Sequence, residues 1–124
     1  MSDFYYLGSP YSKYPTGLDD AFRIICYQAA LLIKAGVPIF CPISHTHYIA
    51  QYGNIDGRKH ELWSAVNKPF LERAFGLIVV KMHDWELSKG LAEEIQAFTD
   101  DHRPIYYMTP GFVPPELFGP DGNS

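Results

Sequence analysis

The sequence predicts an α/β fold: a doubly wound parallel sheet with helices on both faces. Strand-like and helix-like segments alternate along the chain, which is typical of this class. Residues 77–80 (LIVV) form a continuous apolar, mostly β-branched run, as expected for a strand covered on both faces. The repeated strand–helix–strand order implies right-handed parallel crossovers. At 124 residues, we expect one domain with a single core.

The first half of the chain predicts two strands joined by a helix. Residues 4–7 form the first strand, which stops at Gly8-Ser9-Pro10, and a polar loop over residues 12–17 follows. Residues 19–35 then show helical spacing of apolar side chains, with Lys34 near the negative end of the helix dipole. Gly36 is expected to end this helix in a left-handed conformation. Residues 37–41 give the second strand, with Pro38 limiting its hydrogen bonding.

The second half adds two helices and two strands. Residues 42–57 form a connection so long that we expect it to be either functional or partly helical. Residues 58–74 have helical spacing, and Pro69 is expected to kink or split that helix. After the strand at residues 77–80, Ser88 can cap a helix over residues 89–99. Residues 105–108 form the last strand.

The simplest arrangement of these elements is a three-layer α/β/α sandwich of the flavodoxin-like type, with strand order 2-1-3-4. This order places the ends of the first and third strands side by side. Ligands of such sheets bind outside the carboxyl ends of the strands, where the strand order reverses. We therefore expect the Gly8-Ser9 turn and the segment from Asp84 to Glu94 to meet at a ligand site.

Composition and charge argue against some classes of binding partner. The net charge is -4 and the pI about 5.6, which argues against nucleic acid as the main partner. No apolar run approaches the roughly 20 residues needed to span a bilayer, so we expect no membrane partner, and we see no signal peptide. Cys26 and Cys41 lack metal-binding spacing, so we expect reduced thiols in a cytoplasmic protein.

Several candidate residues have rivals close by. Glu93 stands beside Glu94, and Glu86 is close enough to substitute for Asp84. Aromatic rings suited to stacking on a ligand occur in both expected site loops, with Trp85 favoured over exposed tyrosines. Five side chains raise the question of a metal cluster: His45, His47, His60, Glu61 and His83. The pair His45-x-His47 alone supplies too few ligands for a zinc site, so we expect no metal and no cofactor.

Three motifs carry a resemblance to a known family. Tyr6-Leu7-Gly8-Ser9-Pro10-Tyr11 ends the first strand, Asp84 precedes Ser88-x-Gly90-x-x-x-Glu94 after the third strand, and Arg103-Pro104-Ile105 enters the last strand. In this order, they resemble the nucleoside 2-deoxyribosyltransferase superfamily, and most closely a small bacterial branch of it. The resemblance covers residues 1–108, the expected domain, and leaves residues 109–124 as a Pro- and Gly-rich tail.

The resemblance implies roles for these residues. Glu94 would be the nucleophile that attacks the anomeric carbon of the sugar, and Tyr6 would orient its carboxylate. Asp84 would handle the proton or the hydrogen bonds of the leaving base. A carboxylate that captures an oxocarbenium-like centre, with a second group that protonates the leaving group, is the chemistry of retaining glycosidases. The implied substrate-binding residues are Gly8, Ser9, Pro10, Tyr11, Trp85, Ser88, Gly90 and Asn67, the last standing where family members often carry Asp.

The resemblance thus favours an enzyme that hydrolyses or transfers at the N-glycosidic bond of a (deoxy)nucleoside or its 5′-monophosphate. The alternative is a non-catalytic module that binds a nucleotide or sugar phosphate with the same fold. A third interpretation is an assembly protein that makes subunit contacts through the helix over residues 61–74 and the apolar tail. A homo-oligomer is expected, and all three functions allow it.

Overall fold

The computed structural model describes residues 3–11 and 14–119 and has, within them, one four-stranded parallel sheet of order β2-β1-β3-β4. The predicted fold class and strand order are confirmed. The strands are β1 (Tyr5–Gly8), β2 (Ile39–Phe40), β3 (Gly76–Val80) and β4 (Ile105–Met108). In β1, Tyr6 pairs with Phe40 of β2 on one side and with Leu77 of β3 on the other.

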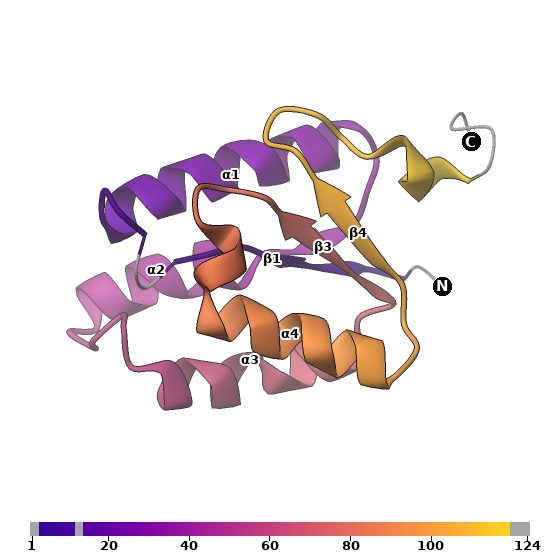
Figure 1. Ribbon diagram of the computed structural model, residues 1–124. Coiled ribbons are helices and arrows are strands. Elements are labelled where there is room, and N and C mark those ends of the chain that lie inside the picture. Colours follow the sequence, from indigo (N-terminus) through magenta and orange to yellow (C-terminus); the bar gives the residue numbers. More distant parts are fainter. Residues whose placement is uncertain (1–2, 12–13, 120–124) are drawn as a thin grey trace.

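Helices cover both faces of this sheet, which gives the predicted three layers (Figure 1). The helices are α1 (Leu18–Lys34), α2 (Pro42–Tyr52), α3 (His60–Arg73) and α4 (Lys89–Asp100). Helix α1 lies on one face and α3 and α4 on the other, while α2 packs beside α1. Two short 3-10 helices follow β3 and β4: η1 (Trp85–Leu87) and η2 (Pro115–Phe118). Positions 12 and 13 of the predicted polar loop lie outside the described residues.

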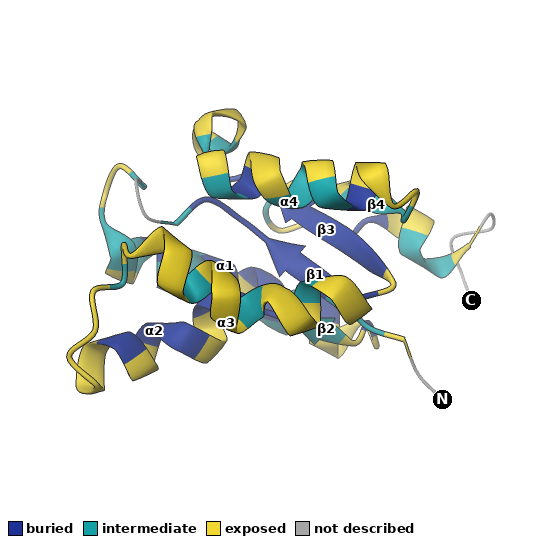
Figure 2. Ribbon diagram, turned by 90° about the horizontal axis from the view of Figure 1, so that it is seen from below, coloured by how far each residue is buried: buried dark blue, intermediate teal, exposed yellow. Residues whose placement is uncertain are grey.

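The strands divide their side chains between two apolar clusters. Leu7, Ile78 and Val80 pack with α1, whereas Tyr6, Leu77 and Val79 pack with α4. This alternation follows from the period of two residues along a strand. Every residue of β3 is buried, as the strands at the centre of Figure 2 show. The continuous apolar run in β3 is therefore explained by cover on both faces.

Two elements differ from the expected bounds. The predicted strand over residues 37–41 is shortened to Ile39–Phe40, because Pro38 has no N–H to donate and Cys41 already serves as the N-cap of α2. Pro42 follows at the first position of α2, where a missing N–H is tolerated. Of the two interpretations of residues 42–57, the partly helical one is confirmed.

Helix α3 continues through Pro69, so the predicted split of this helix is wrong. The hydrogen bond that Pro69 cannot make would go to the carbonyl of Ala65, an exposed residue whose oxygen can bind water instead. No side chain of α3 is fully buried, and Leu62, Val66 and Phe70 stay partly exposed. Such side chains could form contacts between subunits. The homo-oligomer itself stays a prediction.

Arg103 ties the end of α3 to the strand layer. Its Nη1 donates hydrogen bonds to the carbonyls of Leu71 and Ala74, both at 2.8 Å. Its guanidinium also lies 4.0 Å from the centre of the Phe98 ring on α4. Arg103 therefore fastens the C-terminal end of α3 between the sheet and α4, and the rest of α3 is left to form the wall of a cavity.

The segment after β4 returns along α1. The backbone N–H of Gly111 donates to Oε1 of Gln28 on α1 at 2.7 Å. Val113, Leu117 and Phe118 pack against the α1 side of the core, whereas Phe112 is 71% exposed. Residues 120–124 of the predicted tail lie outside the described residues. No helix among the described residues has the length and apolarity that crossing a membrane requires.

Candidate active site

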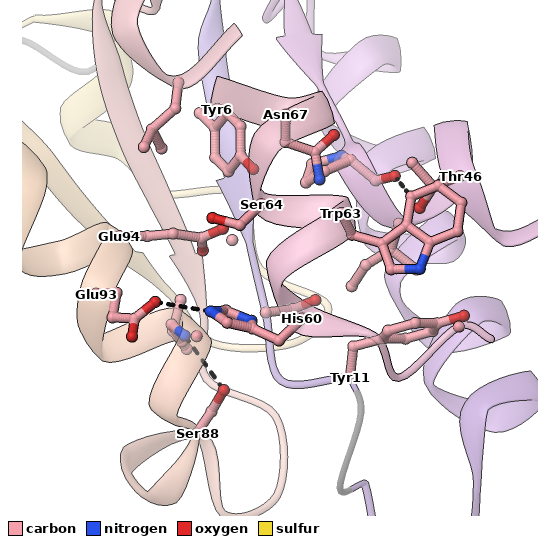
Figure 3. A pocket seen from close by; sticks show the side chains of 18 of the residues that line it. Tyr6, Tyr11, Thr46, His60, Trp63, Ser64, Asn67, Ser88, Glu93 and Glu94 are labelled. Carbon is pink, nitrogen blue, oxygen red and sulfur yellow. Dashed lines mark hydrogen bonds and ion pairs between the residues drawn. The ribbon is translucent and has the colours of Figure 1, made fainter. Parts of the chain in front are cut away.

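A cavity of about 320 Å³ opens at the carboxyl end of β1, between α2, α3 and α4 (Figure 3). Its volume falls within the range of small-molecule sites, about 300–1,000 Å³. Polar side chains from four parts of the chain line it. They include Tyr6, Ser9, Tyr11, Thr46, His60, Ser64, Asn67, Ser88, Glu93 and Glu94. The predicted meeting of the first turn with the segment before α4 is thus found at one cavity.

Glu94 is a carboxyl group with a strongly perturbed pKa in this cavity. Its side chain projects from the first half of α4 toward Tyr6 and Ser64 in Figure 3. Burial raises the pKa of Glu94 to about 8, and the charge of Glu93 adds to the increase, although a hydrogen bond from Tyr6 opposes it. At pH 7 Glu94 is therefore mainly the neutral acid. Buried carboxyl groups with shifted pKa values cluster at functional sites.

Tyr6 has the position from which it can orient this carboxyl group. It lies in β1 with only 2% of its surface exposed, and its ring packs beside Phe40 and Phe98. Burial, followed by the charge of Glu94, raises the pKa of the Tyr6 hydroxyl, which stays protonated and donates to Glu94. The ring is held rigidly by the strand and the core, so the hydroxyl has a fixed direction.

Gly8 lets β1 and α4 approach each other at this point. A Cβ atom at Gly8 would lie 2.9 Å from Oε1 of Glu94 and 2.9 Å from Cδ1 of Leu91. Both contacts are closer than real Cβ atoms make, so a side chain at this position would displace the Glu94 carboxyl group and the Leu91 side chain from their buried positions. Gly8 is therefore needed for space rather than for an unusual backbone conformation, and it lets the Glu94 carboxyl group rest against the strand.

Eight of the eleven predicted site residues line the cavity: Tyr6, Gly8, Ser9, Tyr11, Asn67, Ser88, Gly90 and Glu94. Two of them, Ser9 and Asn67, each carry a buried side-chain oxygen with no hydrogen-bond partner in the described part of the chain. Such groups are rare in proteins, and both residues belong to the lining of the cavity. Ser88 caps α4 by accepting a hydrogen bond from the N–H of Leu91 at 3.3 Å.

The other three predicted residues are not part of the lining formed by the described residues: Pro10, Asp84 and Trp85. Asp84 adopts a left-handed conformation with φ 58° at the start of η1, and its exposed carboxylate pairs with His83 at 3.3 Å. The ring of Trp85 packs beside Tyr107, with centroids 5.7 Å apart. The loop after β3 thus turns these side chains toward solvent and β4, and their predicted roles stay predictions.

Sequence reasoning missed the contribution of α2 and the start of α3. His60 Nε2 lies 2.9 Å from Oε1 of Glu93 and bridges α3 to α4 at the cavity. On α2, a buried face is formed by Ile43, Thr46, His47 and Ala50. Their spacing of three, four and seven residues was the available signal of an inward-facing helix.

The histidines do not form a metal cluster. Among residues 3–11 and 14–119, no group of three or more His, Cys, Asp or Glu side chains is arranged to hold a metal ion. His47 is instead buried beside Phe22, with their rings stacked at 4.1 Å, and His45 lies near Phe40 and Phe70.

The parallel sheet and the carboxyl-bearing cavity at its edge define a small doubly wound α/β protein. Residues 4–109 match the family described as a domain of unknown function, DUF1937. Because this match spans most of the chain, the protein belongs to the DUF1937 family. A comparison with curated proteins finds no match.

Replacing Gly8 with alanine should destabilise the fold by about 1–3 kcal/mol, the usual cost of overpacking. The added methyl group would collide with Glu94 and Leu91. Urea unfolding at pH 7 measures the change. Gly90→Ala is the matched control, because its Cβ would lie 3.5 Å from His60, an ordinary contact. An equal loss of stability in both variants would contradict the close approach of β1 and α4.

Replacing Glu94 with glutamine should make the fold progressively more stable than wild type as the pH rises from 5 to 9. The folded state of wild type keeps the Glu94 proton up to about pH 8, whereas the ordinary pKa is 4.5. Wild type therefore loses stability as the pH rises through this window, by at most about 5 kcal/mol, and a neutral amide does not.

Chemical unfolding at several pH values measures this difference. Glu116→Gln, at an exposed position on η2, is the control and should follow wild type. A constant difference between Glu94→Gln and wild type across this range would mean that the Glu94 carboxyl group is not withdrawn from water.

Proposed function

We propose that this protein cleaves or transfers at the N-glycosidic bond of a (deoxy)nucleoside or its 5′-monophosphate, with Glu94 as nucleophile. The observation that carries the proposal is a buried carboxyl group, Glu94, held beside a tyrosine hydroxyl in a cavity of ligand size. The motif resemblance supports the proposal independently, because it implies roles for Tyr6 and Glu94 and both residues line this cavity.

The chemistry needs a carboxylate at the anomeric carbon. As the bond to the base breaks, positive charge builds on the sugar, and a carboxylate can stabilise or capture it. The carboxylate of Glu94, once formed, has little water to compete with the sugar, because burial is the main cause of its raised pKa. The hydrogen bond from Tyr6 keeps one orientation of the carboxylate and reduces the rearrangement needed during reaction.

The polar groups around Glu94 suit the rest of such a substrate. Ser88 and Gly90 lie at the start of α4, a helix whose N-terminus favours anions and hydroxyl oxygens. The Ser9 hydroxyl and the Asn67 amide oxygen offer hydrogen bonds that the described residues do not use. These groups support binding of the sugar and its 5′ substituent, while Trp63 and Tyr11 offer rings for a base.

A product assay tests the proposal. Purified protein is incubated with a panel of nucleosides and 5′-monophosphates, with and without a free acceptor base, and the released base is quantified by chromatography. Wild type should release base, and Glu94→Gln should lower the rate at least about 1,000-fold, as removal of a nucleophile does. Transfer is distinguished from hydrolysis by new nucleoside that appears only with the acceptor.

Glu116→Gln serves as the control for this substitution. It removes an exposed carboxylate on η2 and should leave base release unchanged. Equal base release by Glu94→Gln and wild type would contradict the proposed nucleophile. Thermal stabilisation by a nucleotide, without release of base from any substrate, would instead support the alternative of a binding module.

A further inference from the structure

A chain of three side chains runs from the cavity to the surface through α2. The Tyr11 hydroxyl, which lines the cavity, lies 2.7 Å from Nδ1 of His47. The other ring nitrogen of His47, Nε2, lies 3.1 Å from Oδ1 of Asp19 at the start of α1. These contacts cannot be predicted from local sequence patterns, since the three residues are separated by 8 to 36 positions.

His47 is held rigidly within this chain. Only 6% of its surface is exposed. Phe22 stacks on the imidazole at 4.1 Å with an angle of 12° between the rings, and Tyr48 meets its edge. The ring is therefore fixed in the plane that joins Tyr11 to Asp19.

The partners fix where the protons lie. An ionised carboxylate only accepts hydrogen bonds, so Nε2 of His47 carries a proton and donates it to Asp19. In neutral His47, Nδ1 accepts the hydrogen bond from Tyr11. When His47 is an imidazolium ion, Nδ1 donates to the Tyr11 oxygen instead, and the phenolic proton of Tyr11 becomes free to point into the cavity.

The two ends of this series of hydrogen-bonded side chains, Tyr11 and Asp19, have opposite environments. Tyr11 faces the cavity, and Figure 3 shows it on the opposite side from Glu94. The Asp19 side chain is 80% exposed and lies against Nε2 of His47. The Tyr11 end can therefore give a proton to a ligand, while the carboxylate at the other end can stabilise the positive charge of a protonated His47.

The proposed reaction needs a proton at this place. A base leaving the sugar takes the electrons of the N-glycosidic bond and must be protonated. Asp84, the residue that the resemblance implies for this task, is not part of the described cavity lining, and its carboxylate pairs with His83.

We propose that Asp19, His47 and Tyr11 form a proton relay that protonates the leaving base, an inference that rests on the proposed N-glycosidic function. Tyr11 touches the base and is the catalytic acid. His47 returns a proton to Tyr11 from Nδ1, and Asp19 is a positioning residue that holds His47 through Nε2.

In the proposed step, the bond from the anomeric carbon to the base nitrogen breaks, and its electron pair stays with the base. Glu94 reacts in its ionised form, and one of its carboxylate oxygens forms a new bond to the anomeric carbon. The Tyr11 proton moves to a nitrogen of the base, and the proton on Nδ1 of His47 replaces it on Tyr11. When water or an acceptor base then attacks the sugar, its proton passes to the Tyr11 oxygen, the Tyr11 proton returns to Nδ1 of His47, and Glu94 leaves as a carboxylate.

The test compares two substrates that differ in their need for a proton. A purine nucleoside releases an anionic base unless it is protonated, whereas its N7-methylated cation releases a neutral base without help. Wild type should cleave both. Tyr11→Phe should lower kcat about 100-fold for the unmodified nucleoside, a typical contribution of general acid catalysis. For the N7-methylated substrate the loss should stay below about threefold, because no acid is needed.

The positioning residue is tested with a matched pair on α1. Asp19→Asn should weaken the relay and lower kcat about tenfold for the unmodified nucleoside only, with KM little changed. Asp20→Asn, whose carboxylate pairs with Arg23 rather than His47, should behave like wild type on both substrates. A selective loss in Tyr11→Phe and Asp19→Asn would support the relay.

Equal losses on both substrates would overturn the relay and show that Tyr11 only shapes the cavity. A selective loss in His60→Gln or Asp84→Asn, with Tyr11→Phe unaffected, would overturn it as well. In either case base release that still depends on Glu94 would leave the proposed function intact. No base from either substrate with wild type would instead overturn the proposed function, and the relay with it.

Discussion

The close contact between the end of β1 and the first half of α4 is the constraint on which the rest of the site depends. Gly8 has no side chain, so Oε1 of Glu94 can lie only 2.9 Å from the position that a Cβ atom would take. Tyr6, two residues earlier in the strand, supplies the hydrogen bond that a buried carboxyl group requires. Withdrawal from water then raises the pKa of Glu94 to about 8. The raised pKa of this carboxyl group is thus produced mainly by strand–helix packing, and the charge of Glu93 adds a smaller contribution.

The sheet order brings the rest of the cavity to this contact. Because β1 is central, the turn after it meets elements from both halves of the chain: α2 from the first half, and α3 and α4 from the second. The α3/α4 side presents Glu94 with Tyr6, and the α2 side presents Tyr11 with His47 behind it. Under the proposed function, these two walls would supply the nucleophile and the source of protons that cleavage of an N-glycosidic bond requires.

Much of the fold was predictable because its signals are local and strong. The apolar run of β3, the periodicity of α1 and the stop at Gly36, which has φ 86°, each follow from a few neighbouring residues. Tyr6 and Glu94 were predicted as site residues from the motif resemblance, and both line the cavity. The Asp19–His47 contact was not predictable, since it joins residues 28 positions apart on helices whose packing sets the distance. The outward position of Asp84 follows from a left-handed turn that the sequence alone does not reveal.

The most direct test of the account is to trap the sugar on the nucleophile. A nucleoside with fluorine at C2′ slows reactions that pass through a positively charged sugar, so a covalent intermediate should accumulate. Mass spectrometry of the digested protein should then show the sugar attached to the peptide that contains Glu94, and specifically to that residue. An adduct on Glu93, or no adduct in a protein that releases base from the parent nucleoside, would contradict the account.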